Sequence, residues 1–106
     1  MIGSANFSVD RLYRYSLLRV WQPAGSRLVW VMLNPSTADE ERNDATIRRC
    51  TGFALNLGYG GIEVYNLFAF CATHPAALIG LPDPVGRNND LFLAQIPEDR
   101  LIVVAW

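Results

Sequence analysis

The sequence predicts an α/β domain that forms a three-layer sandwich, with a mostly parallel central sheet and an antiparallel edge strand near the N-terminus. Residues 27–33 (RLVWVML) and 101–106 (LIVVAW) are unbroken apolar runs, typical of parallel strands buried on both faces. Between them, apolar residues recur at the three- and four-residue spacing of an amphipathic helix. Strands that alternate with helices favour parallel pairing through right-handed crossovers. Residues 1–106 have the size of a single domain.

Two strands are expected before that helix. Residues 13–21 (YRYSLLRVW) are rich in aromatic and branched side chains and alternate imperfectly between apolar and polar. The segment QPAGS that follows has Pro and Gly in turn positions. Residues 27–33 are therefore expected to form a hairpin with residues 13–21, which then form the antiparallel edge of the sheet.

The helix in the middle of the chain has sequence signals at both ends. Asp44 is expected to be the N-cap, because its carboxylate accepts a hydrogen bond from a free backbone N–H of the first turn. Gly58 is expected to end the helix, since glycine readily adopts the left-handed conformation found there. The face toward the sheet is expected to carry the apolar residues at helical spacing: Ile47, Cys50, Phe53, Ala54 and Leu57.

The second half of the chain predicts two more strands and two short helical segments. They are a strand at residues 62–67 (IEVYNL), a helical turn at 75–81, a helix from Asn88 or Asn89 through Gln95, and the strand at 101–106. A buried last strand without a following helix leaves one sheet face thinly covered. We expect either that the C-terminal part of the domain is missing from this chain or that another subunit supplies the cover. The second alternative predicts a homo-oligomer formed through the exposed C-terminal strand.

Composition limits the function classes only weakly. The net charge of −1 indicates neither a nucleic-acid nor a membrane partner. All nine basic residues are arginine, which pairs well with phosphates, although a GC-rich gene also favours arginine codons. No apolar run is long enough for a signal peptide or a membrane span, which favours a cytoplasmic protein. Cys50 and Cys71 lack metal-ligand spacing and are expected to be buried free thiols, and the sequence indicates no metal or cofactor.

Two amide side chains are expected at one rim of the sheet. Ligands of open parallel sheets bind at the carboxyl ends of the strands, and Asn34 and Asn66 stand at two such ends. A carboxamide can read the edge of a base, or hold a water in line for attack, without carrying charge. Pro35 restricts Asn34 to an extended conformation. Ser36 and Thr37 offer hydroxyl and backbone N–H groups to an anion such as phosphate.

Each of these features also has an ordinary structural interpretation. Asn-Pro-Ser-Thr is a common turn, and the acidic residues that follow it suit the start of a helix. Arg48 fits the polar face of that helix, although from its first turns it also reaches toward a phosphate near the preceding turn. Tyr59 and Phe68 fit either packing or stacking on a base. His74, the only histidine, is either incidental or a general acid or base.

Five blocks of sequence resemble a bacterial and phage family called domain of unknown function 1643. The resemblance runs from about residue 13 to the end and keeps the blocks in the order of the family: MLNPSTAD, DATIRRC, GYGGIEVYNLFAF, ATHPAAL and DPVGRNND. Members of that family continue past the strand that ends here in AW, through a helix and a later block with a histidine-proline pair. The resemblance therefore implies that a C-terminal part is missing from this chain.

A more distant resemblance is to the uracil-DNA glycosylase superfamily, particularly its mismatch-specific branch. Residues 32–36 (MLNPS) are similar to its first motif, Gly-Ile-Asn-Pro-Gly, and residues 65–67 (YNL) with 72–75 (ATHP) resemble its next strand end. The resemblance implies a uracil-DNA-glycosylase-like fold in which Asn34 orients the attacking water and Asn66 contacts the base. Four further residues would lie beside the substrate: Pro35, Ser36, Thr37 and Thr73. Serine in place of the last glycine leaves less room for a flipped base, and no basic groove for duplex DNA is evident.

The leading functional prediction is hydrolysis of an N-glycosidic bond in a nucleic acid or nucleotide. Asn34 positions the water, Asn66 reads the base, and Tyr59 or Phe68 stacks on it. A second hypothesis is a non-catalytic nucleotide or nucleic-acid binding module that keeps the pocket and lacks the chemistry. A third is a structural or protein-interaction fragment whose apolar last strand pairs with a partner.

Overall fold

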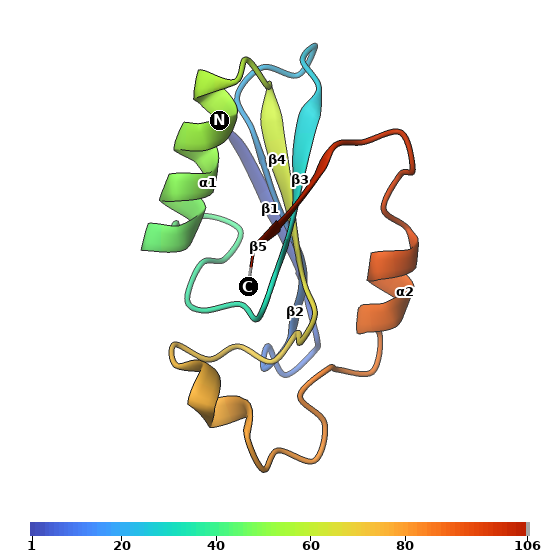
Figure 1. Cartoon of the computed structure of the whole chain (residues 1–106). Coiled ribbons are helices and arrows are strands. Elements are labelled where there is room, and N and C mark those ends of the chain that lie inside the picture. Colours follow the sequence, from blue (N-terminus) through green and yellow to red (C-terminus); the bar gives the residue numbers. More distant parts are fainter. Residues whose placement is uncertain (106) are drawn as a thin grey trace.

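The computed structural model describes residues 1–105 and shows a five-stranded mixed sheet with a helix on each side (Figure 1). The strand order is β1-β2-β4-β3-β5, and α1 and α2 lie on opposite faces. In chain order the elements are β1 (Ile2–Phe7), β2 (Arg14–Val20), β3 (Arg27–Met32), α1 (Ala45–Asn56), β4 (Gly61–Asn66), the 3₁₀ helix η1 (Pro75–Leu78), α2 (Asn89–Ala94) and β5 (Ile102–Ala105). The prediction of an α/β chain with a mixed sheet is confirmed.

The middle of the sheet is parallel, as the apolar runs predict. β3 pairs in parallel with β4 on one side and with β5 on the other. Leu28 and Val29 are neighbours in β3 that belong to the cores on opposite faces, and both are fully buried. Met32 pairs with Asn66. The two strands therefore end at the same level, and the chain leaves both of them at one edge of the sheet.

The N-terminal part of the sheet differs from the prediction. An additional strand, β1, is the antiparallel edge and pairs with β2. β2 is an inner strand that pairs with β4, so the predicted hairpin between β2 and β3 is wrong. The link between β2 and β3 crosses the start of β4, where the backbone N–H groups of Trp21 and Gln22 both donate to the carbonyl oxygen of Gly60. The sequence of β1, IGSANF, carries no clear alternating pattern because most of this edge strand is exposed.

The predicted ends of α1 are confirmed. Asp44 is the N-cap, and its side chain accepts a hydrogen bond from the backbone N–H of Ile47. Gly58 follows the helix with a φ of 84°, a left-handed conformation that glycine adopts without a steric cost. The capping carboxylate thus fixes where the helix begins, directly after the turn that leaves β3.

The buried face of α1 is narrower than predicted. Ile47, Cys50 and Ala54 are buried, whereas Phe53 and Leu57 are 62% and 63% exposed. The reason is that α1 packs mainly over β4; on the flank that carries Phe53, its ring meets Trp30 of β3 at 6.2 Å between centroids and is otherwise exposed. The helical spacing alone does not show how much of the apolar stripe the sheet can reach.

The helix α2 occupies the predicted segment, but its asparagines act differently. Asn88 is at the N-cap position and its side chain makes no capping hydrogen bond. Asn89 is fully buried, and its side-chain amide donates to the backbone carbonyl oxygens of Asn66 and Leu67 (2.8 and 3.1 Å). The expected cap is therefore a link that fastens α2 to the end of β4.

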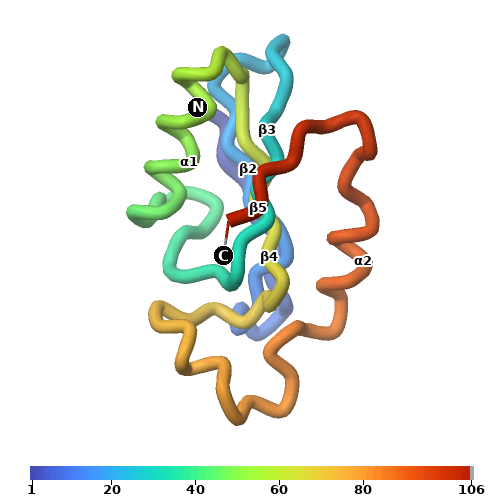
Figure 2. Tube along the Cα trace, viewed as in Figure 1, coloured from blue at the N-terminus to red at the C-terminus, as the bar shows by residue number. Residues whose placement is uncertain are grey.

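The last strand is thinly covered, in line with the expectation for it. Figure 2 shows the chain leaving α2 and returning to the edge of the sheet as β5, which runs beside β3. Ile102 and Val104 are exposed; a homo-oligomer formed through this strand stays a prediction. Cys50 and Cys71 are free, the first buried and the second half-buried. Within residues 1–105, no helix has the length and apolar character needed to cross a membrane.

Gly60→Ala is expected to destabilise the fold, whereas Gly52→Ala is expected to stabilise it. A Cβ at residue 60 would overlap the carbonyl oxygen of Gln22, where two backbone segments cross. Backbone atoms move away only at a cost, so we expect the free energy of unfolding to fall by about 2–3 kcal/mol. A Cβ at residue 52, inside α1, meets nothing within 4 Å, and alanine there should add about 1 kcal/mol. Urea unfolding measures both, and equal stabilities would contradict the close crossing.

Candidate functional site

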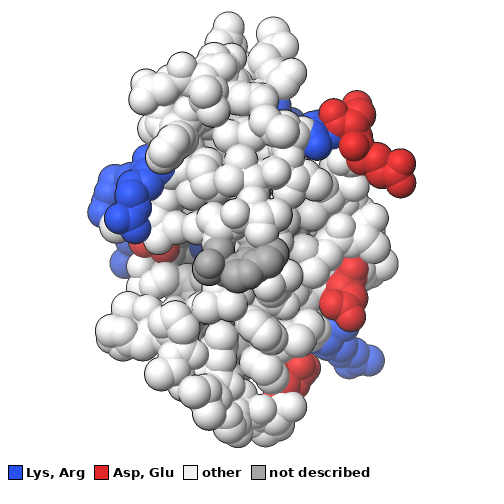
Figure 3. All heavy atoms as spheres, in the orientation of Figure 1, with Lys and Arg blue, Asp and Glu red and all other residues white. Residues whose placement is uncertain are grey.

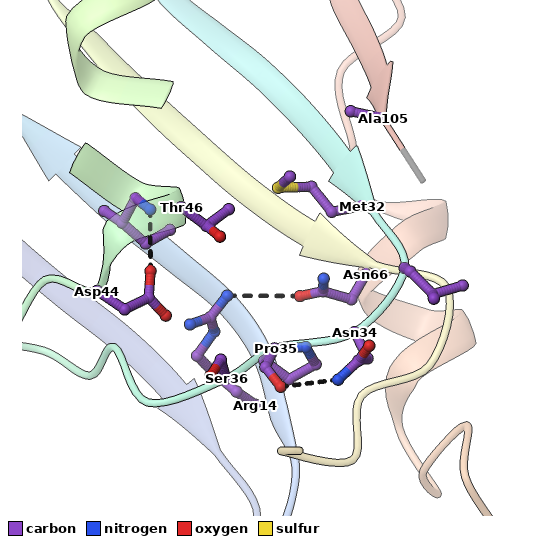
Figure 4. Close-up of a pocket in the computed structure, with 11 residues that line it drawn as sticks. Arg14, Met32, Asn34, Pro35, Ser36, Asp44, Thr46, Asn66 and Ala105 are labelled. Atoms are coloured by element: carbon purple, nitrogen blue, oxygen red, sulfur yellow. Dashed lines mark hydrogen bonds between the residues drawn. The ribbon is translucent and has the colours of Figure 1, made fainter. Parts of the chain in front are cut away.

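A pocket of about 140 Å³ lies where β3 and β4 end and α1 begins (Figure 4). It is at the carboxyl edge of the parallel strands, where ligands bind in open α/β sheets. Its walls come from β2, the turn after β3, the first turn of α1, the end of β4 and the end of β5. The polar residues among them, which decide its chemistry, are Arg14, Asn34, Ser36, Asp44, Thr46 and Asn66.

Asn34 lines the pocket with an amide held in a fixed orientation. Its Nδ2 donates to the carbonyl oxygens of Ala72 (2.8 Å) and Pro35 (3.0 Å), and Figure 4 shows the second of these bonds. Both hydrogens of the amide are therefore used by the backbone, as in an ordinary turn. Its Oδ1 accepts no hydrogen bond from residues 1–105. Asn34 is thus an oriented acceptor at the pocket rather than a donor.

Asn66 lies deeper in the pocket and is fixed from both sides. It is 2% exposed, and its Oδ1 accepts a long hydrogen bond from Nη2 of Arg14 (3.5 Å; Figure 4). Its backbone carbonyl oxygen accepts a bond from the side chain of Asn89. The structure therefore brings both predicted amides to one pocket, but Asn66 faces an arginine.

Arg14 places a buried positive charge in this pocket. It is 2% exposed; its Nη1 donates to the carbonyl oxygen of Ala38 (3.2 Å), and its Nε has no hydrogen-bond partner among residues 1–105. The acceptors it does reach are neutral, and no carboxylate in the described part of the chain forms an ion pair with it. Burial lowers the pKa of Arg14 well below its ordinary value, to about 10. At neutral pH the guanidinium remains charged, so the folded state carries the cost of removing that charge from water.

A bulge in β2 turns Arg14 toward α1. The register between β1 and β2 shifts by one residue at Tyr15, which is left as an extra residue in β2. Tyr15 stacks on Phe92 of α2, with 5.2 Å between the ring centroids, and so belongs to the other face. Strict alternation would place Arg14 and Leu17 on opposite faces. Because of the bulge both lie on the α1 side, Leu17 in the core and Arg14 in the pocket.

Arg19, on the same face of β2, shows how a structural arginine differs. It is as buried as Arg14, but each of its three nitrogens donates a hydrogen bond to a protein acceptor. Nε bonds Oδ1 of Asn43 (2.8 Å), and the two Nη atoms bond the carbonyl oxygens of Leu18, Asp39 and Arg42. Arg19 thereby ties the loop before α1 to β2. Arg14 retains donors that no described residue uses.

The start of α1 adds further donors. Thr46, in the first turn, and Ser36, in the turn after β3, both line the pocket and carry hydroxyl groups. The first backbone N–H groups of a helix lack intrahelical acceptors and form the positive end of its dipole. Asp44 contributes the only carboxylate of the described lining. Its Oδ1 accepts from the backbone N–H of Ile47 (2.9 Å) and its Oδ2 from that of Ala38 (3.2 Å), so both oxygens already have donors.

Five other residues of the predicted site lie at the rim or outside it. Pro35 lines the pocket and is fully buried. Thr37, Thr73 and Arg48 are exposed and do not line it. Phe68 is half-buried beyond the end of β4, also outside the lining. Thr37, Thr73 and Arg48 therefore contribute no side chain to the lining of the pocket.

Tyr59 is at the opposite end of the sheet. It precedes β4, whereas the pocket follows β4. Its carbonyl oxygen accepts a hydrogen bond from Nε1 of Trp21 (2.9 Å), and its side chain packs on the core beneath α1. His74 is exposed at the start of η1 and does not line the pocket. The structure therefore brings neither ring to the two amides.

Three residues that shape the pocket are absent from the sequence prediction. Arg14 has a signal, since it is a charged residue inside an aromatic and apolar strand whose alternation is irregular. Thr46 also has a sequence signal, because it stands two residues after the N-cap Asp44 and so belongs to the first turn of the helix. Asn89 has none, because its hydrogen bonds join α2 to a strand that ends 23 residues earlier in the chain. Local patterns do not indicate contacts of that kind.

Comparison with known proteins places the pocket inside a recognised family region. A family model described as "Protein of unknown function (DUF1643)" matches residues 14–106, from Arg14 onward. No curated protein and no solved structure matches the sequence. Within residues 1–105, no group of three or more His, Cys, Asp or Glu side chains is arranged to hold a metal ion.

Arg14→Met is expected to change the free energy of unfolding by less than about 1 kcal/mol. The variant loses two long hydrogen bonds to neutral acceptors, but it also removes an uncompensated buried charge. Arg19→Met should lower the same free energy by about 3 kcal/mol, because it leaves three part-buried carbonyl oxygens and the side chain of Asn43 without their donor. Chemical denaturation of the two variants in parallel provides the comparison. If Arg14→Met costs as much as Arg19→Met, Arg14 is a structural residue and not a site residue.

Proposed function

The chain belongs to the family described as "Protein of unknown function (DUF1643)", and from this premise we propose that its pocket binds the phosphate group of a nucleotide or nucleic acid. The function is binding without catalysis. The observation that carries it is the buried guanidinium of Arg14, which lines a pocket at the carboxyl edge of the sheet with its Nε unpartnered. An anion in the pocket provides the missing acceptor and the missing opposite charge.

The environment of Arg14 makes an anion more favourable here than at the surface. Two opposite charges 4 Å apart attract by about 4 kcal/mol at an effective dielectric constant of 20, against about 1 kcal/mol in water. Arg14 is already removed from water in the folded protein, so binding an anion does not have to desolvate it again. The anion therefore gains most of that attraction. Asp44 opposes it, but its oxygens are directed to backbone N–H groups. The positive end of α1 acts in the same direction as Arg14.

The size of the pocket favours one chemical group rather than a whole ligand. Sites that enclose a small molecule usually measure about 300–1,000 Å³, whereas this pocket has about 140 Å³. A phosphate fits that space, and the rest of the ligand remains outside it. A fully enclosed flipped base with its sugar does not fit.

The mixture of donors favours phosphate over carboxylate. A phosphate accepts hydrogen bonds on several oxygens directed apart, and donors approach this pocket from β2, from the turn after β3 and from α1. The N-terminus of a helix is a common phosphate site for the same reason. Asn34, with its Oδ1 without a donor in the described chain, stands beside the pocket as an acceptor for the exocyclic amine of a base.

We expect inorganic phosphate and nucleoside monophosphates to bind the wild-type protein, and Arg14→Met to weaken that binding at least about tenfold, the equivalent of 1.4 kcal/mol. Arg87→Met is the matched control, because Arg87 is exposed and outside the pocket. Isothermal titration calorimetry at low salt measures both. Equal affinities for wild type and Arg14→Met would overturn the proposal.

Hydrolysis of an N-glycosidic bond is the second candidate. The observation in its favour is Asn34, whose amide is oriented by two hydrogen bonds and presents an oxygen that no described residue uses. Such an oxygen can hold a water in line for attack on the sugar. The small pocket and the engaged carboxylate of Asp44 weigh against it, so it ranks below binding.

A hydrolase would release free base, and this is directly measurable. Under this second candidate, wild type releases base from oligonucleotides containing uracil, a thymine mismatch or a deaminated purine, and Asn34→Ala lowers the rate by about 10²-fold or more while still binding. Chromatography of the released base follows the reaction. If wild type releases none from the whole panel, the hydrolase is excluded for these substrates and phosphate binding is unaffected.

A further inference from the structure

We propose, building on the phosphate-binding function above, that the pocket takes a terminal phosphate, a phosphomonoester, and not the bridging phosphodiester of a nucleic-acid backbone. The ligand is then a nucleoside monophosphate or the phosphorylated end of a strand. The inference depends on how the pocket is closed, on how its donors are placed and on the charges around it.

The first argument is the depth of the cation. Arg14 is 2% exposed, and Pro35 and Asn66, which line the same pocket, are buried as well. A phosphodiester carries a sugar on each side, so both substituents must leave the site. Only a phosphate with at most one substituent can enter a small pocket and reach a buried guanidinium.

The second argument is the number of directions from which donors come. Arg14 comes from β2, Ser36 from the turn after β3 and Thr46 from the first turn of α1, and all three line the pocket (Figure 4). A phosphomonoester presents three terminal oxygens that accept hydrogen bonds, whereas a diester presents two. Near neutral pH the monoester also carries close to two negative charges, since its second pKa is about 6. Both properties favour the monoester in a site with a buried cation and a helix N-terminus.

The third argument is the surface around the pocket. A protein that binds the nucleic-acid backbone needs several cations along the path of the strand. The pocket lining among residues 1–105 has one cation and one carboxylate. On the face in Figure 3 the charged side chains are few and scattered, and no continuous basic band crosses it. This distribution of charge is consistent with binding of a single phosphate at the end of a ligand, and not with binding along a nucleic-acid backbone.

The test compares adenine ligands that carry different kinds of phosphate. They are adenosine 5′-monophosphate, the diester dinucleotide ApA without a terminal phosphate, and the same dinucleotide with a 5′-phosphate. Binding is measured by calorimetry to wild type, Arg14→Met and the control Arg87→Met. We expect the monophosphate and the 5′-phosphorylated dinucleotide to bind at least about tenfold more tightly than ApA. This preference should disappear in Arg14→Met, and the affinity for the monophosphate should fall as pH drops below about 6.

The outcomes separate the two proposals. If ApA binds as tightly as the phosphorylated ligands and Arg14→Met weakens all three, the pocket recognises a diester; the terminal-phosphate inference is then overturned and phosphate binding stands. If inorganic phosphate and all three ligands fail to bind wild type, both proposals are wrong. If only the 5′-phosphorylated dinucleotide binds, the ligand is a strand end, and if the mononucleotide binds equally well, it is a free nucleotide.

Discussion

The parallel pairing of β3 with β4 is the constraint on which the rest of the pocket depends. Its register aligns Met32 with Asn66, so the two chains leave the sheet side by side. The turn after β3 then lies across the end of β4, and α1 begins next to both. A shift of one residue in this pairing would turn the side chain of Asn66 to the opposite face, away from Arg14. The positions of Asn66, of the turn after β3 and of the start of α1 follow from that alignment.

The energetic balance of the pocket is unusual for so small a domain. A chain of this length has little stability in reserve, yet it holds a guanidinium in a nearly dry position without an ion-pair partner among residues 1–105. Arg19 demonstrates that the same strand can satisfy a buried arginine fully. The two side chains differ in their hydrogen bonds: Arg19 holds a loop in place, whereas Arg14 keeps an unpartnered Nε, which the proposed function assigns to an anion.

The sequence indicated the features that arise from local patterns. The unbroken apolar runs predicted the parallel strands, and the spacing from Ile47 onward with the Asp44 cap predicted α1. The hairpin between β2 and β3 was a wrong prediction, because a short turn between strands does not reveal that β4, far along the chain, inserts between them. The amides of Asn34 and Asn66 were placed correctly at one edge, since parallel strands end together. Arg14 was missed, because a bulge decides which face it occupies.

The bulge at Tyr15 decides whether the pocket contains a positive charge. The direction of Arg14 depends on one surplus residue in β2 and not on the kind of side chain there. If Tyr15 instead paired regularly, with no residue left over, alternation from Leu17 would place Arg14 on the α2 side, where aromatic rings now stack. The sheet would keep its strands and its core while the pocket lost its charge. In this fold, the pairing of β2 and the chemical character of the pocket are therefore coupled, and relatives that share every pocket residue can still differ in what they bind.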